Sequence, residues 1–194
     1  IAPKAVAATA KVGHAAAMTA RPAARPAYVF DFDSTLVRIE TLEALADLAL
    51  TGAPDADAVR AEVTRLTDQA MAGEIGFGEA LRQRLAMLPL SRAHVDALAD
   101  RILDEGAPSV RRNRQWFLDN ADRVVIVSGG FRDVIAPIAA RLGVAPERVL
   151  CNDLRYDSDG RVTGVDDANP LSHAGGKIEA IRALNLSGPV VMVG

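Results

Sequence analysis

The chain has 194 residues, of which 49% are hydrophobic and 24% are charged, and its formal net charge is −3 at pH 7. These values exclude a disordered or collagen-like chain and predict one globular domain, with or without a smaller insert. The slightly acidic balance and the 4% aromatic content argue against a nucleic-acid-binding surface, and no apolar run approaches the roughly 20 residues that a membrane-spanning helix needs.

The first 27 residues differ from the rest, because they contain no Asp or Glu and are dominated by alanine. We expect residues 1–27 to be a disordered leader or linker. The alternative is an organelle transit peptide, which is also poor in acidic residues. The single cysteine, Cys151, has no partner for an internal disulfide and favours a reducing compartment. The expected location is therefore the cytoplasm, or an organelle if 1–27 is a transit peptide.

The first half of the remaining chain is predicted to be mostly helical. A short apolar strand is predicted over 28–30, immediately before Asp31. Apolar residues at helical spacing, interrupted by Gly and Pro, then predict helices over 40–50, 55–71, 77–88 and 91–104. The stretch 51–104 is typical of an all-helical insert.

The second half alternates strands and helices. The run Val124–Val127 has no polar alternation, which is typical of a parallel strand covered on both faces. We predict that Ser128-Gly129-Gly130 forms the turn from this strand into a helix. The other predicted elements are a helix from 106 to about 120, a helix over 131–142 kinked or interrupted at Pro137, a β-hairpin with strands at 154–156 and 161–163, a helix over 178–184 and a buried strand over 190–193.

This order of elements predicts an α/β fold. We expect a doubly wound, Rossmann-like parallel sheet core with an inserted all-helical cap and a β-hairpin flap. The core is expected to comprise 28–50 and 105–194, and the cap 51–104. Because a domain rarely stops at the end of a strand, we expect the core to continue past Gly194.

Two acidic residues, Asp31 and Asp33, follow the first predicted strand. Side chains two positions apart in an extended chain point to the same side, and open α/β sheets bind ligands just beyond such strand ends. Two neighbouring carboxylates repel, so one ionises readily while the other tends to hold its proton. The pair therefore suits a nucleophile beside a general acid, and its oxygens suit Mg²⁺.

The run Asp31-Phe32-Asp33-Ser34-Thr35 resembles the first motif, Asp-x-Asp-x-Thr, of the haloacid dehalogenase superfamily of phosphotransferases. The resemblance implies that Asp31 attacks phosphorus and forms an aspartyl phosphate. It implies that Asp33 protonates the leaving oxygen and then activates water. It also implies that Asp31 and Asp33 are ligands of Mg²⁺, Asp33 through its backbone carbonyl.

Ser128 and Lys177 match the second and third motifs of this superfamily. The resemblance implies that the Ser128 hydroxyl and the Gly129 amide bind phosphate oxygens close to a helix N-terminus. Lys177 is the only lysine after residue 11 in a chain that otherwise uses arginine. Its compact ammonium suits a place between Asp31 and a phosphate oxygen, where a planar guanidinium fits less well.

The fourth motif of the superfamily, which begins Gly-Asp-Gly after the last strand, is not present beyond Val193-Gly194. Its first Asp is a metal ligand in that superfamily. The resemblance therefore predicts Asp as the residue that follows Gly194.

Within the superfamily, residues 28–194 resemble the phosphoserine phosphatase family. The resemblance implies that Glu40 binds the substrate ammonium and Arg84 the substrate carboxylate, with Arg82 as the alternative to Arg84. The supporting motifs are Asp31-Phe32-Asp33-Ser34-Thr35-Leu36-Val37, the segment 70–84 and Ser128-Gly129-Gly130-Phe131. Further substrate contacts are implied for Met71, Phe77, Gly130 and Asn152.

The resemblance implies a Mg²⁺-dependent hydrolase that converts O-phospho-L-serine to L-serine and phosphate, the last step of serine biosynthesis. The expected partner is this small molecule, with no nucleic acid and no membrane, and the sequence leaves the oligomeric state open. The alternatives are a phosphatase of the same superfamily that acts on another small phosphomonoester, and a non-catalytic truncated or fusion module without the fourth motif. The three histidines have no catalytic spacing and no predicted role: His14, His94 and His173.

Overall fold

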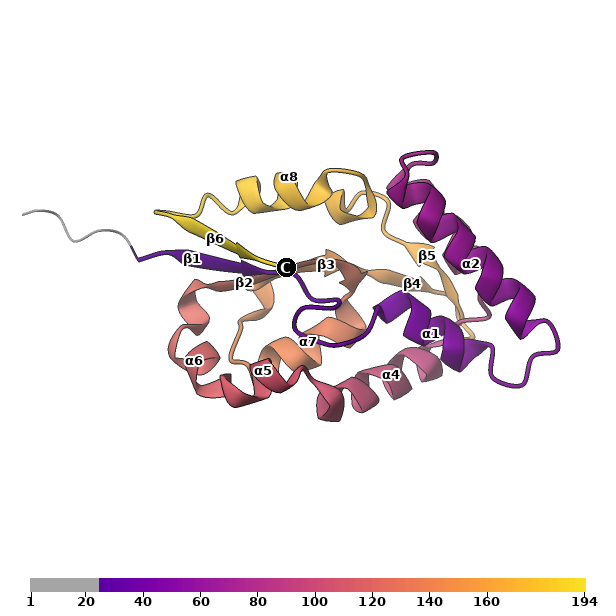
Figure 1. The fold of residues 1–194 in the computed structure, drawn as a ribbon, viewed down its shortest axis with the longest axis horizontal. Coiled ribbons are helices and arrows are strands. Elements are labelled where there is room, and N and C mark those ends of the chain that lie inside the picture. The colour runs from indigo at the N-terminus through magenta and orange to yellow at the C-terminus, as the bar shows by residue number, and fades with distance from the viewer. Residues whose placement is uncertain (1–24) are drawn as a thin grey trace, which may run out of the picture.

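A computed structural model of the chain describes residues 25–194, so the prediction for 1–27 lies almost entirely outside the described residues. The centre of the fold is a parallel sheet with the strand order β3-β2-β1-β6 (Figure 1). β1 lies between β2 and β6, and ligands bind beyond the strand ends at such a switch in strand order. The strands of this sheet are β1 (Ala27–Phe30), β2 (Val124–Phe131), β3 (Val149–Asn152) and β6 (Val190–Val193).

Strand β2 is buried on both of its faces. Val124 and Ile126 belong to one hydrophobic cluster, and Val125 and Val127 belong to a second one. All four side chains are at most 1% exposed. The prediction of a parallel strand covered on both faces is therefore confirmed.

Helices cover both faces of the sheet, which confirms the α/β class. α8 lies along one face, and α5, α6 and α7 lie along the other (Figure 1). The helices are α1 (Thr41–Ala49), α2 (Ala56–Met71), α3 (Phe77–Met87), α4 (Arg92–Glu105), α5 (Pro108–Arg112), α6 (Arg114–Asp119), α7 (Arg132–Arg141) and α8 (Gly176–Ala183).

Three predictions about local structure are wrong. The helix expected from 106 to about 120 is divided at Asn113 into α5 and α6. The predicted interruption at Pro137 is absent, because α7 is continuous through this residue. Residues 128–130 do not form the turn before α7; β2 continues to Phe131, with irregular pairing to β3.

Strand β6 forms where it was predicted, but its predicted burial is wrong. Val190, Val191 and Met192 are 43%, 41% and 58% exposed. The reason is that β6 pairs only with β1 and stands at the edge of the described sheet. Strand β3 was not predicted, because its four residues carry no alternation of apolar and polar side chains.

Residues 51–104 are mainly helical, as predicted, and the helices have different neighbours. α2 and α3 pack against each other, whereas α4 packs against α7 and α1. α3 also contacts the predicted β-hairpin, which is formed by β4 (Leu154–Tyr156) and β5 (Val162–Val165). The division into a core and a cap stays a prediction. Within 25–194, no helix combines the length and the apolar character needed to cross a membrane.

Candidate active site

Asp31 follows β1 directly and is held by two neighbours. Its Oδ1 accepts a hydrogen bond from the Phe32 amide at 2.8 Å, and its Oδ2 accepts one from Lys177 Nζ at 2.5 Å. Phe32 is fully buried and anchors the segment between the two acids in the core. The predicted pairing of Lys177, at the start of α8, with the acid at the end of β1 is thus present across 146 residues of sequence.

Asp33 is held by the first residue of α1. Its Oδ1 accepts hydrogen bonds from the Thr41 hydroxyl and from the Thr41 amide, the latter at 3.1 Å. Burial raises the pKa of Asp33 to about 6, although the hydrogen bonds from Thr41 favour the charged form. A carboxyl group with such a pKa can donate and accept a proton near neutral pH. Thr41 itself was not predicted to take part in the site.

Ser128, Gly129 and Gly130 bring the backbone of β2 close to these acids. The Ser128 hydroxyl is buried and accepts a hydrogen bond from the Gly130 amide at 2.9 Å. A Cβ on Gly129 would lie 3.2 Å from the Phe77 ring, and one on Gly130 would lie 3.4 Å from Asp33 Oδ2. The absence of side chains at both positions therefore leaves backbone amides accessible for a phosphate group.

We name the group formed by Asp31, Asp33, Ser128–Gly130 and Lys177 the phosphate end. These residues line one cavity of about 440 Å³, together with the predicted substrate contacts Glu40, Met71, Phe77 and Arg84. The cavity has further lining residues that were not predicted: Leu42, Glu43, Thr67, Ala70, Leu81 and Phe131.

The opposite part of the cavity, which we name the amino-acid end, comprises Glu40, Glu43, Met71, Phe77 and Arg84. Glu40 accepts a hydrogen bond from the Ser34 hydroxyl at 2.7 Å. Burial raises the pKa of Glu43, which lies one helical turn after Glu40 on α1. That spacing places both acids on one face of the helix and was a sequence signal for Glu43 that the prediction missed.

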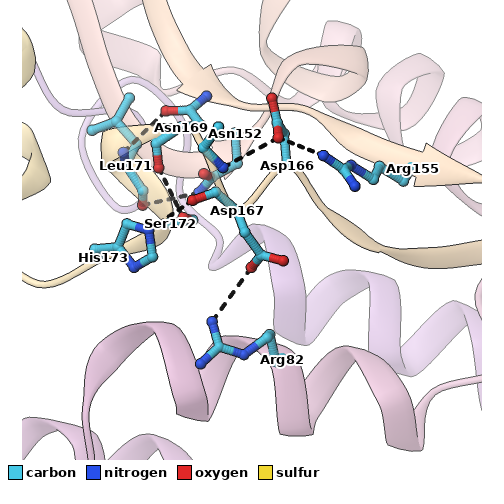
Figure 2. A network of polar contacts seen from close by, with 10 residues as sticks. Arg82, Asn152, Arg155, Asp166, Asp167, Asn169, Leu171, Ser172 and His173 are labelled. Atoms are coloured by element: carbon cyan, nitrogen blue, oxygen red, sulfur yellow. Dashed lines mark hydrogen bonds and ion pairs between the residues drawn. The ribbon is translucent and has the colours of Figure 1, made fainter.

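The structure decides between the two candidate arginines on α3. Arg84 lines the cavity and donates hydrogen bonds to the Ala80 carbonyl at 3.2 Å and to the Thr67 hydroxyl at 3.0 Å. Burial lowers its pKa, while Glu43 and Glu40 act in the opposite direction. Arg82 is exposed and pairs with Asp167 at 3.4 Å instead (Figure 2). Thr67 gave no signal in the sequence, because only the packing of α2 on α3 brings it to Arg84.

The prediction that Asn152 contacts the substrate is not supported by its position. The side chain is fully buried and is not among the residues that line the cavity. Its amide nitrogen donates to two backbone carbonyls, those of Gly129 and Leu171. Asn152 therefore lies behind the phosphate end, where strand β3 carries it.

The acidic groups of the phosphate end fit Mg²⁺ only in part. Among the described residues, no group of three or more His, Cys, Asp or Glu side chains is arranged to hold a metal ion. Mg²⁺ is often held by one or two carboxylates together with substrate phosphates and waters. The pair Asp31 and Asp33 thus fits an ion that binds together with a phosphate group, rather than one enclosed by protein side chains.

Residues 28–192 match the family of haloacid dehalogenase-like hydrolases, and the chain belongs to this family. Among its curated relatives, the phosphoserine phosphatase of Mus musculus is 33% identical over 158 residues, which are 81% of this chain and 67% of the relative. A substrate-bound phosphoserine phosphatase complex is 26% identical, with a TM-score of 0.64 and coverage of 82% of this chain and 70% of the other. A phosphoserine phosphatase with an analogue of the phospho-aspartyl intermediate is 28% identical, with a TM-score of 0.60 and coverage of 87% and 78%.

Proposed function

We propose that this chain hydrolyses O-phospho-L-serine to L-serine and inorganic phosphate. One observation carries the proposal: a single cavity holds Asp31, Asp33 and Lys177 at one end and Glu40 and Arg84 at the other. O-phosphoserine carries a phosphate at one end and an ammonium and a carboxylate at the other. Hydrogen bonds between charged groups contribute about 1.5–3 kcal/mol each, so Glu40 and Arg84 can select this zwitterion over esters that lack either charge.

The first half of the proposed reaction transfers the phosphoryl group to the protein. A carboxylate oxygen of Asp31 attacks phosphorus, and the bond between phosphorus and the serine oxygen breaks. Asp33 gives its proton to the departing oxygen, which leaves as the hydroxyl of L-serine. The Ser128 hydroxyl, the amides of Gly129 and Gly130, and Lys177 hold the phosphate oxygens as their charge changes.

The second half releases phosphate and restores the protein. Asp33, now a carboxylate, takes a proton from a water molecule as the water oxygen attacks phosphorus. The bond between phosphorus and Asp31 breaks, which returns the Asp31 carboxylate and leaves Asp33 protonated for the next cycle. The pKa of about 6 at Asp33 suits both proton transfers.

Asp31 and Asp33 are proposed to hold Mg²⁺ together with the substrate phosphate. The bound cation would supply positive charge that neutralises the phosphate and favours attack by an anionic carboxylate. Lys177 adds a second positive charge on the other side of Asp31, where its ammonium already contacts Oδ2.

We also propose that the helical segment 51–104 is the cap and that 28–50 and 105–194 form the core. In support, α2 and α3 supply Thr67, Met71, Phe77 and Arg84 to the cavity, while the phosphate end comes from β1, β2 and α8. Movement of α2 and α3 would admit the substrate and the lytic water, and their return would exclude bulk solvent.

The test is phosphate release by the purified chain from three esters, with Mg²⁺ and with EDTA. O-phosphoethanolamine lacks the substrate carboxylate, and 3-phosphoglycerate has a hydroxyl in place of the ammonium. We expect fast, EDTA-sensitive release from O-phosphoserine and at least about tenfold slower release from the other two. Equal rates on all three would favour a phosphatase for other small phosphomonoesters, and no release from any would favour a non-catalytic module. A rate that EDTA leaves unchanged would contradict the role of Mg²⁺.

The proposed location is the cytoplasm, with the organelle alternative resting on residues 1–27. Cell fractionation of the tagged protein with and without these residues separates the two. A protein that moves out of an organelle when 1–27 are removed would contradict the cytoplasmic assignment.

A further inference from the structure

Strand β2 departs from regular pairing with β3 where it carries the phosphate-binding residues. Val127 pairs with Leu150, and the next pair along the ladder joins Phe131 to Asn152. Four steps along β2 thus lie opposite two steps along β3, so that residues 128–130 bulge out of the ladder. The bulge turns the backbone groups of Gly129 away from the positions in which strand partners would bind them.

The side chain of Asn152 takes the place of the missing strand partner. Its Nδ2 donates to the Gly129 carbonyl at 2.8 Å and to the Leu171 carbonyl at 3.1 Å. Both partners are carbonyl oxygens, which only accept hydrogen bonds, so the amide nitrogen must face both of them. Figure 2 shows Asn152 beside the loop that carries Asn169, Leu171 and Ser172.

The second partner of Asn152 leads to Lys177. Leu171 lies in a short 3-10 helix, Pro170–Ser172, which precedes α8. Gly176, the first residue of α8, packs so closely on this segment that a Cβ there would lie 1.8 Å from the Pro170 carbonyl. The next residue is Lys177, which donates to Asp31 at 2.5 Å.

We infer that Asn152 is a positioning residue for phosphoryl transfer: it ties the Ser128–Gly130 bulge and the segment that carries Lys177 to one buried point. This inference rests on the proposed function. The two phosphate-binding elements come from separate parts of the chain, β2 and α8, and both must face Asp31 at the same time. One amide group that binds both backbones holds their separation constant.

The unsatisfied oxygen of Asn152 supports a role in positioning rather than in stability alone. Its Oδ1 is buried and has no hydrogen-bond partner among the described residues. A buried oxygen without a partner destabilises the fold, and an apolar side chain of similar shape would avoid that cost. The two N–H donors are therefore what distinguishes Asn from leucine at this position.

The inference is tested first by amide hydrogen exchange on the whole chain, which needs no substrate. In Asn152→Leu, which keeps the size and removes both donors, we expect faster exchange over 128–131 and over 170–177. Asn152→Asp places a carboxylate against the same two carbonyls and should show the same pattern if the leucine variant does not fold. Faster exchange in only one segment, or in neither, would overturn the inference.

Two matched variants separate positioning from general destabilisation. Cys151→Ala alters the preceding buried residue, which lies in the same strand, and should leave the exchange of both segments unchanged. Asn169→Ala removes the bond from Asn169 to the Cys151 carbonyl and should loosen 170–177 only. Loosening of 128–131 in either control would show that the coupling does not run through Asn152.

Kinetics give a second reading that a purely structural role would not produce. With O-phosphoserine or p-nitrophenyl phosphate, we expect kcat of Asn152→Leu to fall by about a hundredfold, as for a misplaced catalytic group. Inhibition by inorganic phosphate should weaken, whereas inhibition by L-serine should not change, because Glu40 and Arg84 do not contact Asn152. Equal weakening of both inhibitors would overturn the inference. A parent chain that does not hydrolyse O-phosphoserine would refute the proposed function, and the exchange experiment would still decide the role of Asn152.

Discussion

The phosphate end and the amino-acid end of the cavity are built in different ways. The phosphate end is tied to the sheet: Asp31 and Ser128 follow or belong to parallel strands, and their polar groups bind backbone amides. The amino-acid end consists of side chains on α1, α2 and α3, of which Met71 is 83% exposed. The strand ends hold the reacting groups in fixed positions, whereas the helices present groups that recognise the rest of the substrate.

This difference follows from what each end must do. A displacement at phosphorus requires the attacking and stabilising groups in nearly fixed positions, and an error of about 1 Å can cost a hundredfold in rate. Recognition of an ammonium or a carboxylate by a long side chain tolerates more movement, because the side chain can follow its partner. The strands therefore suit the chemistry, and the helices suit selection of the substrate.

The largest expected effect is at the phosphate end. Asp31→Asn removes the nucleophile while keeping the shape of the side chain, and we expect turnover to fall by about 10⁴-fold or more. The measurement is phosphate release from O-phosphoserine, with circular dichroism to establish that the variant folds. Turnover close to that of the parent chain would refute the role of Asp31 and with it the assignment of the phosphate end.

A smaller effect is expected at the amino-acid end. Arg84→Ala should raise KM for O-phosphoserine by about 10- to 100-fold, because one charge-assisted contact with the substrate carboxylate is lost. Its matched control is Arg82→Ala, which removes an exposed arginine two residues away that does not line the cavity. We expect this control to leave KM nearly unchanged.

The esters sharpen the same comparison. With O-phosphoethanolamine, which has no carboxylate, Arg84→Ala should have little effect on KM. If Arg84→Ala slows hydrolysis of this ester as strongly as that of O-phosphoserine, then Arg84 belongs to the phosphate end and the division of the cavity is wrong.

The smallest expected effect concerns stability of the metal-free protein. Because burial raises the pKa of Asp33 to about 6, the folded state binds a proton more readily than the unfolded state near neutral pH. The charged carboxylate therefore destabilises the fold at pH 7, and this penalty disappears as the pH falls to about 4. Asp33→Asn removes the charge and keeps an acceptor for Thr41, so it should raise the free energy of unfolding at pH 7 by about 1–3 kcal/mol.

Urea unfolding in EDTA at several pH values between about 4 and 7 measures this effect. The difference between Asp33→Asn and the parent chain should shrink as the pH falls. A difference that stays constant with pH would show that the buried charge of Asp33 is not its cause. An equivalent pH series for Glu40→Gln is the control from the amino-acid end, since Glu40 is exposed.

The sequence by itself determined the parts of this protein that depend on neighbouring residues. The apolar run Val124–Val127 predicted a strand buried on both faces, because such a strand has no solvent-facing side to carry polar residues. The spacing of Asp31 and Asp33 predicted two acids on one side of a strand end, since alternate residues of an extended chain share a side. Helical periodicity located α1 to α4 for the same local reason.

The tertiary structure decided what depends on distant residues. Periodicity alone could not show that Arg84 faces the cavity while Arg82 turns to Asp167, because that choice depends on how α3 packs against α2 and the hairpin. It could not place Asn152 behind Gly129, since the bulge in β2 becomes visible only when β3 lies beside it. The exposure of β6 is likewise set by which strands flank it rather than by its own apolar residues. Local patterns report the covalent neighbours of a residue, whereas these three outcomes are set by contacts that form only when the chain folds.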